Sequence, residues 1–187
     1  ATAILAGDAL QTLAFQTLAE ADGIPAPARV AMVAALALAS GSRGMAGGQA
    51  LDLAAEGQRL DRAMLEHIHI HKTGALIRAA VQLAILADGP LDAGLAGRLD
   101  RFAKCIGLAF QIQDDVLDVE GDTASTDKTG GRDQALDKAT YPAIVGLSEA
   151  KELAATLTAD ALAALDPLPA RADPLRWIAQ ALSARTR

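Results

Sequence analysis

The stretch from Leu91 to Asp118, LDAGLAGRLDRFAKCIGLAFQIQDDVLD, decides the fold class of this chain. Its apolar residues recur every three or four positions, the spacing that places side chains on one face of a packed α-helix. These residues are Leu91, Leu95, Leu99, Phe102, Ile106, Ala109 and Phe110. From Ile106 to Phe110 the helix would be apolar nearly all round, as in a helix buried at the centre of a bundle. The stretch therefore predicts a long central helix over residues 91–120.

Turn signals divide the rest of the sequence into further helices. Alanine and leucine lead the helix-propensity ranking, and no run of alternating apolar and polar residues indicates a strand. Glycine and proline clusters, such as Gly23-Ile24-Pro25 and Gly89-Pro90, separate the helical segments. Helices are predicted over residues 2–21, 27–40, 45–56, 61–87, 91–120, 140–165 and 173–184. With 187 residues, the chain is predicted to be a single all-α domain over residues 1–187.

Composition and charge exclude several classes of protein. Hydrophobic residues make up 51% of the chain, enough to offset the entropy of ordering and to exclude a disordered chain. The net charge of −6 and the aromatic content of 3% argue against a nucleic-acid partner, because neither phosphate neutralisation nor base stacking is supplied.

The sequence also predicts neither a membrane span nor a secretory signal. The longest apolar run, Val30 to Ala39, is about half of the roughly 20 residues that a spanning helix needs, so no membrane span is expected. A secretory signal needs a basic amino-terminal segment, and Arg29 is the first basic residue. Cys105 is the only cysteine, which excludes an intrachain disulfide. We therefore expect a cytoplasmic protein.

Three aspartates follow the apolar part of the predicted central helix. Asp114 and Asp118 share one helix face, and Asp115 lies about 100° round the helix. Like charges at this spacing cost about 0.2–0.5 kcal/mol, and anions near the carboxyl end oppose the helix dipole by about 0.3–1 kcal/mol. One interpretation is an acidic, solvated helix end. The other is a site for Mg²⁺, which clustered carboxylates suit and which would remove both penalties.

Basic residues that could hold an anionic ligand lie in two places. Lys72-Thr73-Gly74 falls inside the predicted helix 61–87, where Gly74 costs about 1 kcal/mol relative to alanine and indicates a local break or a close backbone approach. Lys128 and Lys138 follow the aspartates. As isolated patterns, these lysines fit solvated surface groups better than ligands.

Three alternating histidines, His67, His69 and His71, precede Lys72. His67 and His71 share a helix face, a spacing that occurs in zinc sites. No cysteine or acidic residue accompanies them in the usual ligand arrangement. We therefore favour a place on the helix surface, or behind the ligands of a site, over zinc binding.

Five short motifs in this sequence resemble those of the trans-prenyl diphosphate synthases, the polyprenyl synthetase family, and most of all its bacterial farnesyl diphosphate synthase group. The string from Phe110 to Asp118, FQIQDDVLD, is similar to the family's second aspartate-rich motif. HKTGALI, residues 71–77, resembles its lysine–threonine motif. The other matches are LAGDAL (residues 5–10), GQALDL (48–53) and KATYP (138–142). They follow the family's order and approximate spacing over most of the chain.

The resemblance implies a fold and a reaction. The fold is the isoprenoid synthase-type helical bundle with a central cavity, usually as a homodimer. The reaction joins isopentenyl diphosphate to an allylic diphosphate, dimethylallyl or geranyl, and gives a short-chain product such as farnesyl diphosphate. The allylic diphosphate ionises, a carbon–carbon bond forms, and a proton passes to the released pyrophosphate. Mg²⁺, or Mn²⁺ in its place, is the implied cofactor.

The resemblance also implies roles for individual residues. Asp114, and less directly Asp115 and Asp118, would hold the metal against the leaving diphosphate. The Thr73 carbonyl and the Gln111 side chain would face the developing cation. The implied catalytic residues are Lys72, Thr73 and Gln111, and the implied substrate-binding residues are Lys72, Gln111, Lys128 and Lys138. Such a site works by electrostatic stabilisation in a dry cavity.

Two family motifs are not found in the 187 residues: a first aspartate-rich motif and a Gly-Lys-Arg motif, both upstream in the family. We therefore expect that about a third of the usual protein is missing from this sequence and that residues 1–187 alone are inactive. The alternative is a non-catalytic helical subunit or remnant. Clustered aspartates would destabilise such a protein without serving a function, so their presence argues against this alternative. A terpene cyclase of similar fold is disfavoured, because that group resembles Asn/Ser/Glu at the second metal motif.

Overall fold

Helices fill the part of the chain that the computed structural model describes, residues 1–124 and 139–184, with side chains described except at 122–124. No strand occurs within these two ranges, which confirms the predicted all-α class. The elements are α1 (Thr2–Ala19), α2 (Ala26–Ser40), α3 (Met45–Ala54), α4 (Arg62–His69), the π-helical turn η1 (Ile70–Gly74), α5 (Ala75–Asp88), α6 (Ala93–Ala124), α8 (Tyr141–Val145), α9 (Leu147–Leu165), the 3₁₀ turn η2 (Ala170–Ala172) and α10 (Asp173–Ser183).

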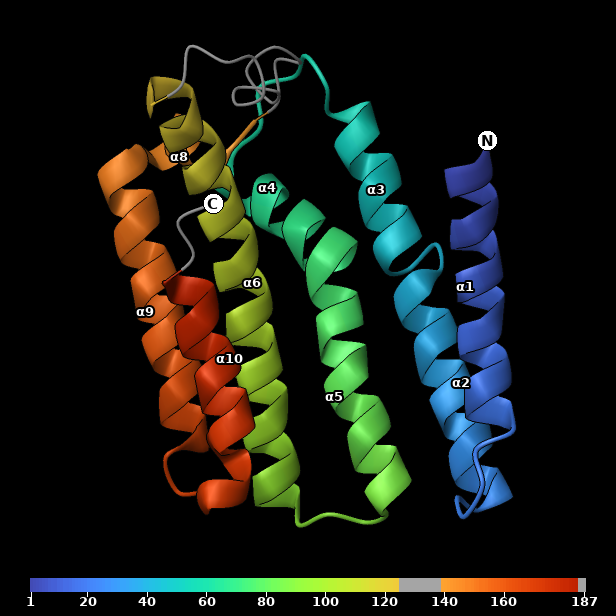
Figure 1. The fold of residues 1–187 in the computed structure, drawn as a ribbon. Coiled ribbons are helices and arrows are strands. Elements are labelled where there is room, and N and C mark those ends of the chain that lie inside the picture. The colour runs from blue at the N-terminus through green and yellow to red at the C-terminus, as the bar shows by residue number, and fades with distance from the viewer. Residues whose placement is uncertain (125–138, 185–187) are drawn as a thin grey trace.

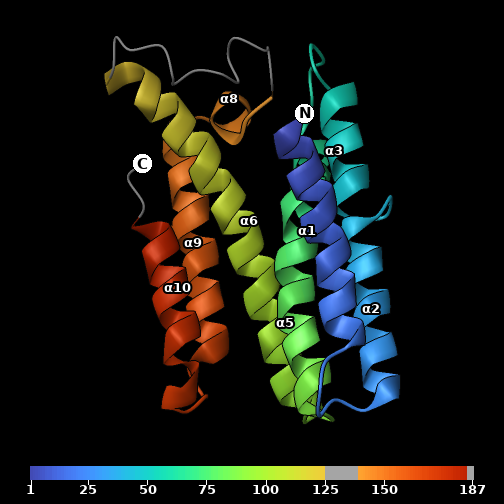
Figure 2. The same ribbon diagram turned by 45° about the vertical axis from the view of Figure 1, so that its right-hand side comes forward.

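The helices lie side by side in one bundle. Figures 1 and 2 show α6 packed with α9 and α10 on one side of the molecule, and α1 and α2 together on the other. Helix α5 stands between these two groups and contacts both α2 and α6. The predicted central helix is confirmed as α6, whose buried Phe102, Ile106, Ile112 and Val116 belong to the core.

Two apolar clusters form the described core along α6. The first joins α6 to α4, α8 and α9 and contains Leu65, Ile112, Val116, Tyr141, Ala150 and Ala154. The second joins α6 to α9 and α10 and contains Phe102, Ile106, Ala161, Ala164, Leu165 and Ala179. Small alanine side chains on α9 and α10 let these helices approach α6 closely. The first cluster surrounds the end of α6 that carries the aspartates, and its close packing holds that end in place.

Two of the longer predicted helices have different outcomes in the structure. The single helix predicted over residues 140–165 is wrong, because Gly146 has φ +89 and separates α8 from α9. A residue with a Cβ rarely takes this conformation, so glycine marks the break. The predicted helix 61–87 is confirmed as a continuous helical run, Arg62–Asp88, within which η1 is a π-helical turn that ends at Gly74. Of the two features expected at Gly74, the close backbone approach is the one observed, because a Cβ at Gly107 would lie 3.2 Å from the Gly74 Cα.

Apolar surface is exposed on the α1 side of the chain. None of the residues of α1 is buried, and Ile4, Leu5, Leu10 and Leu13 are exposed. The segments Ala26–Ala54 and Arg62–Asp88 are long and apolar enough to cross a membrane by length and composition alone, a test that core helices of soluble proteins also pass. The expected lack of a membrane span therefore stays a prediction.

Candidate active site

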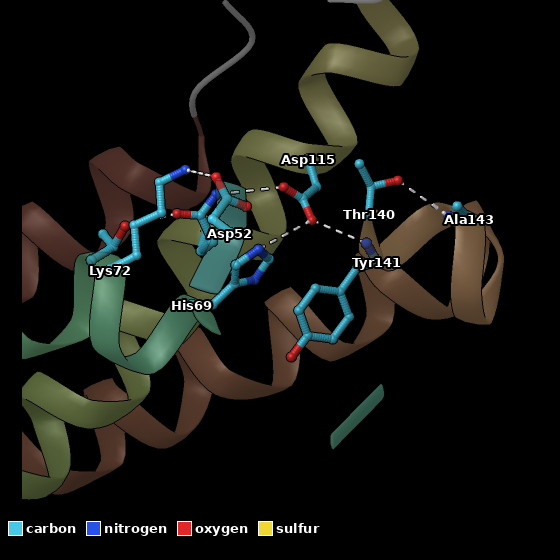
Figure 3. A network of polar contacts seen from close by, with 9 residues as sticks. Asp52, His69, Lys72, Asp115, Thr140, Tyr141 and Ala143 are labelled. Carbon is cyan, nitrogen blue, oxygen red and sulfur yellow. Dashed lines mark hydrogen bonds and ion pairs between the residues drawn. The ribbon is translucent and has the colours of Figure 1, made fainter. Parts of the chain in front are cut away.

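Four elements that are distant in sequence bring polar side chains together at one end of the bundle. They are α3, the α4–η1 segment, the carboxyl half of α6 and the start of α8. Figure 3 shows Asp52, His69, Lys72, Asp115 and Tyr141 from these elements in one network of contacts. Of the predicted site residues, hydrogen bonds join Thr73 to Gln111 and Gln111 to Asp115, whereas Lys72 pairs with Asp52, which was not predicted.

Lys72 forms an ion pair with Asp52 across the contact between η1 and α3. The Lys72 Nζ lies 2.6 Å from Asp52 Oδ2, and both side chains are partly buried. The approach depends on Gly48, one turn before Asp52, because a Cβ at this position would lie 2.2 Å from the Lys72 backbone nitrogen. The pair holds the ammonium group in place and leaves it partly open to a second anion.

Thr73 connects η1 to α6 through Gln111. The Thr73 hydroxyl donates a hydrogen bond of 2.8 Å to Gln111 Oε1. The end of η1 and helix α6 approach closely one turn earlier on α6, where a Cβ at Gly107 would lie 3.2 Å from the Gly74 Cα. Because neither Gly74 nor Gly107 has a side chain, the two backbones come near enough for the Thr73 hydroxyl to form its hydrogen bond with the Gln111 amide.

Asp115 is buried, with a relative exposure of 5%, and links three elements. Its Oδ2 accepts a hydrogen bond of 3.0 Å from the Tyr141 backbone N–H, and its Oδ1 accepts a longer one of 3.4 Å from Gln111 Nε2. The His69 Nε2 lies 3.9 Å from Oδ2 (Figure 3). A buried carboxylate without such partners would be costly, so these contacts account for its place in the core.

His69 is neutral at pH 7 in this setting. Its pKa is lowered to about 4, mainly by burial; the Asp52 carboxylate opposes this change, and the Lys72 ammonium group acts in the same direction as burial. Burial also raises the pKa of the Tyr141 hydroxyl, and Glu66 acts in the same direction. Within the described ranges, His69 Nδ1 and the Tyr141 hydroxyl are buried without a hydrogen-bond partner.

Asp114 and Asp118 lie on a different part of the α6 surface from Asp115. Asp114 is exposed and Asp118 is half-buried, at the four-residue spacing expected for one helix face. Lys128 and Lys138, the other predicted substrate-binding residues, lie outside the described residues. Among the residues described, no group of three His, Cys, Asp or Glu side chains converges as a metal site.

The side chains of the three histidines lie in different surroundings. His67 and His71 stack with ring centroids 4.2 Å apart, and the His71 Nδ1 lies 2.8 Å from the His67 carbonyl oxygen. His69, between them in sequence, turns inward toward Asp115 and Tyr141. Asp52, the partner of Lys72, is a candidate functional residue that was not predicted from the sequence. Its signal was the spacing of four residues from Gly48 to Asp52, which puts both on the face of α3 toward η1.

The polyprenyl synthetase family model matches residues 1–166, which contain every described residue of this site. The chain belongs to the polyprenyl synthetase family. It is 54% identical over 170 residues to farnesyl diphosphate synthase from Escherichia coli strain K12, a match that covers 90% of this chain and 57% of that protein. It is 47% identical over 154 residues to farnesyl diphosphate synthase from Geobacillus stearothermophilus, covering 81% of this chain and 52% of that protein.

Solved polyprenyl synthetase relatives share the fold. The geranyltransferase of Legionella pneumophila superposes with a TM-score of 0.84 at 31% identity, over 99% of this chain and 60% of that one. The Helicobacter pylori geranyltransferase, solved with magnesium and isoprenyl diphosphate, has a TM-score of 0.77 at 36% identity, over 97% and 59%. The chain therefore spans a little more than half the length of the relatives it matches.

The donor set of this family member fits a hard divalent cation. Asp114 and Asp118 supply carboxylate oxygens from an accessible helix face, and such oxygens are the protein ligands that Mg²⁺ takes. Mg²⁺ also keeps waters and commonly completes its shell with substrate phosphates, so one or two carboxylates suffice on the protein side. Lys72 lies on η1, which contacts α6, and its side chain is partly exposed beside Asp52.

Proposed function

We propose that the protein, at its natural length, is a prenyltransferase that condenses isopentenyl diphosphate with an allylic diphosphate to give a short-chain prenyl diphosphate such as farnesyl diphosphate. The observation that carries the proposal is the hydrogen bond between Thr73 and Gln111, which joins the segment that holds Lys72 to the helix that holds Asp114 and Asp118, within the family match. The printed functions of the relatives support the same reaction class. With one aspartate-rich motif, residues 1–187 alone are expected not to condense the substrates.

Each described residue has a task in this proposal. Asp114 and Asp118 would hold Mg²⁺, with Mn²⁺ as a substitute, and the metal would neutralise charge on the departing diphosphate. Lys72 binds that diphosphate by a charge-assisted contact, and its bond to Asp52 fixes the ammonium group beforehand. Because the diphosphate gains charge as it leaves, this contact strengthens in the transition state. Lys128 and Lys138 are proposed to add further charge-assisted contacts.

Thr73 and Gln111 act on the organic part of the substrate. The Thr73 carbonyl and the Gln111 side-chain oxygen present negative ends of dipoles to the developing allylic cation, as the family resemblance implies. Their mutual hydrogen bond of 2.8 Å keeps these dipoles fixed, so little reorganisation is needed as charge develops. The proton lost after bond formation goes to the released pyrophosphate.

We also propose a homodimer in the cytoplasm. The support is the exposed apolar surface of α1, none of whose residues is buried within this chain. A contiguous apolar helix surface of this kind indicates an interaction site.

Calorimetric titration with pyrophosphate, with and without Mg²⁺, tests the proposed binding site. Asp114→Ala should remove the magnesium dependence of binding, and Lys72→Ala should weaken binding in magnesium by roughly the 1.5–3 kcal/mol of a charge-assisted contact. Asp160→Asn and Arg101→Ala, the two partners of an exposed ion pair between α6 and α9, are the matched controls.

Unchanged magnesium dependence in Asp114→Ala would refute the metal assignment. An assay with labelled isopentenyl diphosphate on the natural-length protein separates the two candidate functions. Product formation supports the prenyltransferase, whereas folded protein that binds pyrophosphate without forming product supports the non-catalytic subunit.

A further inference from the structure

We propose that Asp115 is a positioning residue, which fixes the side-chain amide of Gln111 so that its oxygen faces Thr73. The inference rests on the proposed prenyltransferase function and deepens it. It gives the second aspartate of the motif a task that differs from metal binding by Asp114 and Asp118. Four observations carry it: the burial of Asp115, the bonds at both of its oxygens, the polarity of the Gln111 amide, and the link to α8.

The burial of Asp115 sets it apart from its neighbours on α6. Its relative exposure is 5%, whereas Asp114, the preceding residue, is exposed. Both Asp115 oxygens accept hydrogen bonds from N–H donors of the protein: Tyr141 N at 3.0 Å and Gln111 Nε2 at 3.4 Å. An Asp115–metal bond would compete with these contacts inside the core, whereas the exposed Asp114 would hold a metal at the surface.

A carboxylate that accepts hydrogen bonds imposes a direction on a neighbouring amide. Gln111 has one oxygen end and one nitrogen end, and only the nitrogen end can donate to Asp115. With Nε2 turned to Asp115, Oε1 is left to accept the 2.8 Å hydrogen bond from the Thr73 hydroxyl. Asp115 thus selects the amide orientation that places an oxygen, and not an NH₂ group, on the side of η1.

The remaining contacts of Asp115 hold the carboxylate in position. The Tyr141 N–H belongs to the first turn of α8, where Thr140 caps the helix by accepting a hydrogen bond from the Ala143 N–H. Tyr141 is completely buried in the cluster that contains Ile112 and Val116. A shift of the Asp115 side chain would break its bond to the Tyr141 N–H at the start of α8, so the carboxylate that orients Gln111 is itself anchored to a packed element.

Steady-state kinetics on the natural-length protein test the role. Asp115→Asn offers an NH₂ group where an acceptor stood, so Gln111 should lose its fixed orientation. We expect kcat to fall by about 10- to 100-fold, the usual effect of losing a contact behind the reacting groups. The KM for the allylic diphosphate and the magnesium concentration at half-maximal rate should stay at wild-type values. Asp114→Asn should instead raise the magnesium requirement, and Asp115→Glu, which keeps an acceptor, should retain more kcat than Asp115→Asn.

A spectroscopic measurement reads the contact without relying on activity. In protein labelled with ¹⁵N-glutamine, the Gln111 side-chain amide signal, assigned by its loss in Gln111→Glu, should move in Asp115→Asn and stay in place in Asp114→Asn. Should Asp115→Asn fail to fold, Asp115→Glu is compared with the wild type in the same way, and it should keep the signal close to its original position.

The outcomes separate the inference from the proposed function. Two results would overturn the positioning role. One is that Asp115→Asn raises the magnesium requirement as much as Asp114→Asn does, and the other is that the Gln111 amide signal does not move in Asp115→Asn. A wild-type protein that forms no prenyl diphosphate would overturn the proposed function, while a Gln111 signal that still responds to Asp115→Asn would support the contact.

Discussion

His69 is a buried histidine whose protonation would oppose folding. Burial lowers its pKa to about 4 in the folded protein, whereas a histidine in the unfolded chain titrates near 6.5. Between these values the unfolded state binds more protons than the folded state. The free energy of unfolding should therefore fall as the pH falls from about 6.5 to about 4, by up to about 3 kcal/mol from this residue.

Urea unfolding of the wild type and of His69→Gln, with a chelator present, measures this contribution. The variant has no titrating group at this position, so its stability should depend less steeply on pH over that interval. Parallel pH profiles for the two proteins would show that His69 is protonated as easily in the folded state as in the unfolded chain.

Residue-scale predictions from sequence succeed where one segment supplies the whole signal. The placement of Asp114 and Asp118 on one helix face follows from their spacing alone, and so does the helix that carries them. The surroundings of Asp115 could not be predicted, because they come from Tyr141 on α8 and His69 on α4. The sequence placed Asp115 on a different side of the helix from Asp114 and Asp118 but assigned it the same kind of metal role as Asp118, whereas the structure surrounds Asp115 with protein donors. The metal roles of the three aspartates stay predictions, and the positioning role proposed for Asp115 is the alternative for that residue.

At the scale of elements, glycines decide how closely α3 and η1 approach. Gly48→Ala would place a Cβ 2.2 Å from the Lys72 backbone nitrogen, so one element must move. We expect a loss of about 1–3 kcal/mol in unfolding free energy, as in other overpacked contacts. The shift of η1 should also weaken pyrophosphate binding by moving Lys72.

Gly97→Ala is the matched control for this prediction. Gly97 lies in α6, and a Cβ there would have no neighbour within 4 Å. Alanine should therefore stabilise the helix by about 0.5–1 kcal/mol. Chemical unfolding of the two variants and the wild type measures whether the unfolding free energy falls in Gly48→Ala and rises in Gly97→Ala. Equal effects at the two positions would mean that the α3–η1 contact is looser than the structure has it.

Element boundaries were predictable from local signals except where tertiary packing sets them. The limits of α2 and α10 follow from Pro25 and from Asp173-Pro174, close to the predicted ranges. The break at Gly146 was missed, because a single glycine within an alanine-rich segment is usually tolerated in a helix. There α8 turns away from α9 so that Tyr141 can enter the core beside Asp115. That requirement is tertiary, and no local pattern expresses it.

At the scale of the whole molecule, the exposed surface of α1 predicts self-association. Leu10 and Leu13 are 66% and 52% exposed and lie three residues apart, on neighbouring positions of one helix face. Monomeric soluble proteins rarely leave a large contiguous apolar surface open to water. We therefore expect the natural-length protein to sediment as a dimer. The double variant Leu10→Glu/Leu13→Glu should sediment as a monomer, because charges on this face would have to be buried unpaired in the dimer.

Sedimentation equilibrium and thermal unfolding together identify what covers α1. Trp177→Glu, at a residue 68% exposed on α10, is the control and should leave the dimer intact. Dissociation of the double variant with little change in protomer unfolding supports the dimer face. A variant that loses stability while its mass stays that of the wild type would instead show that α1 packs against residues of the same protomer. Dissociation by Trp177→Glu alone would place the dimer contact on α10, at the opposite side of the bundle from α1.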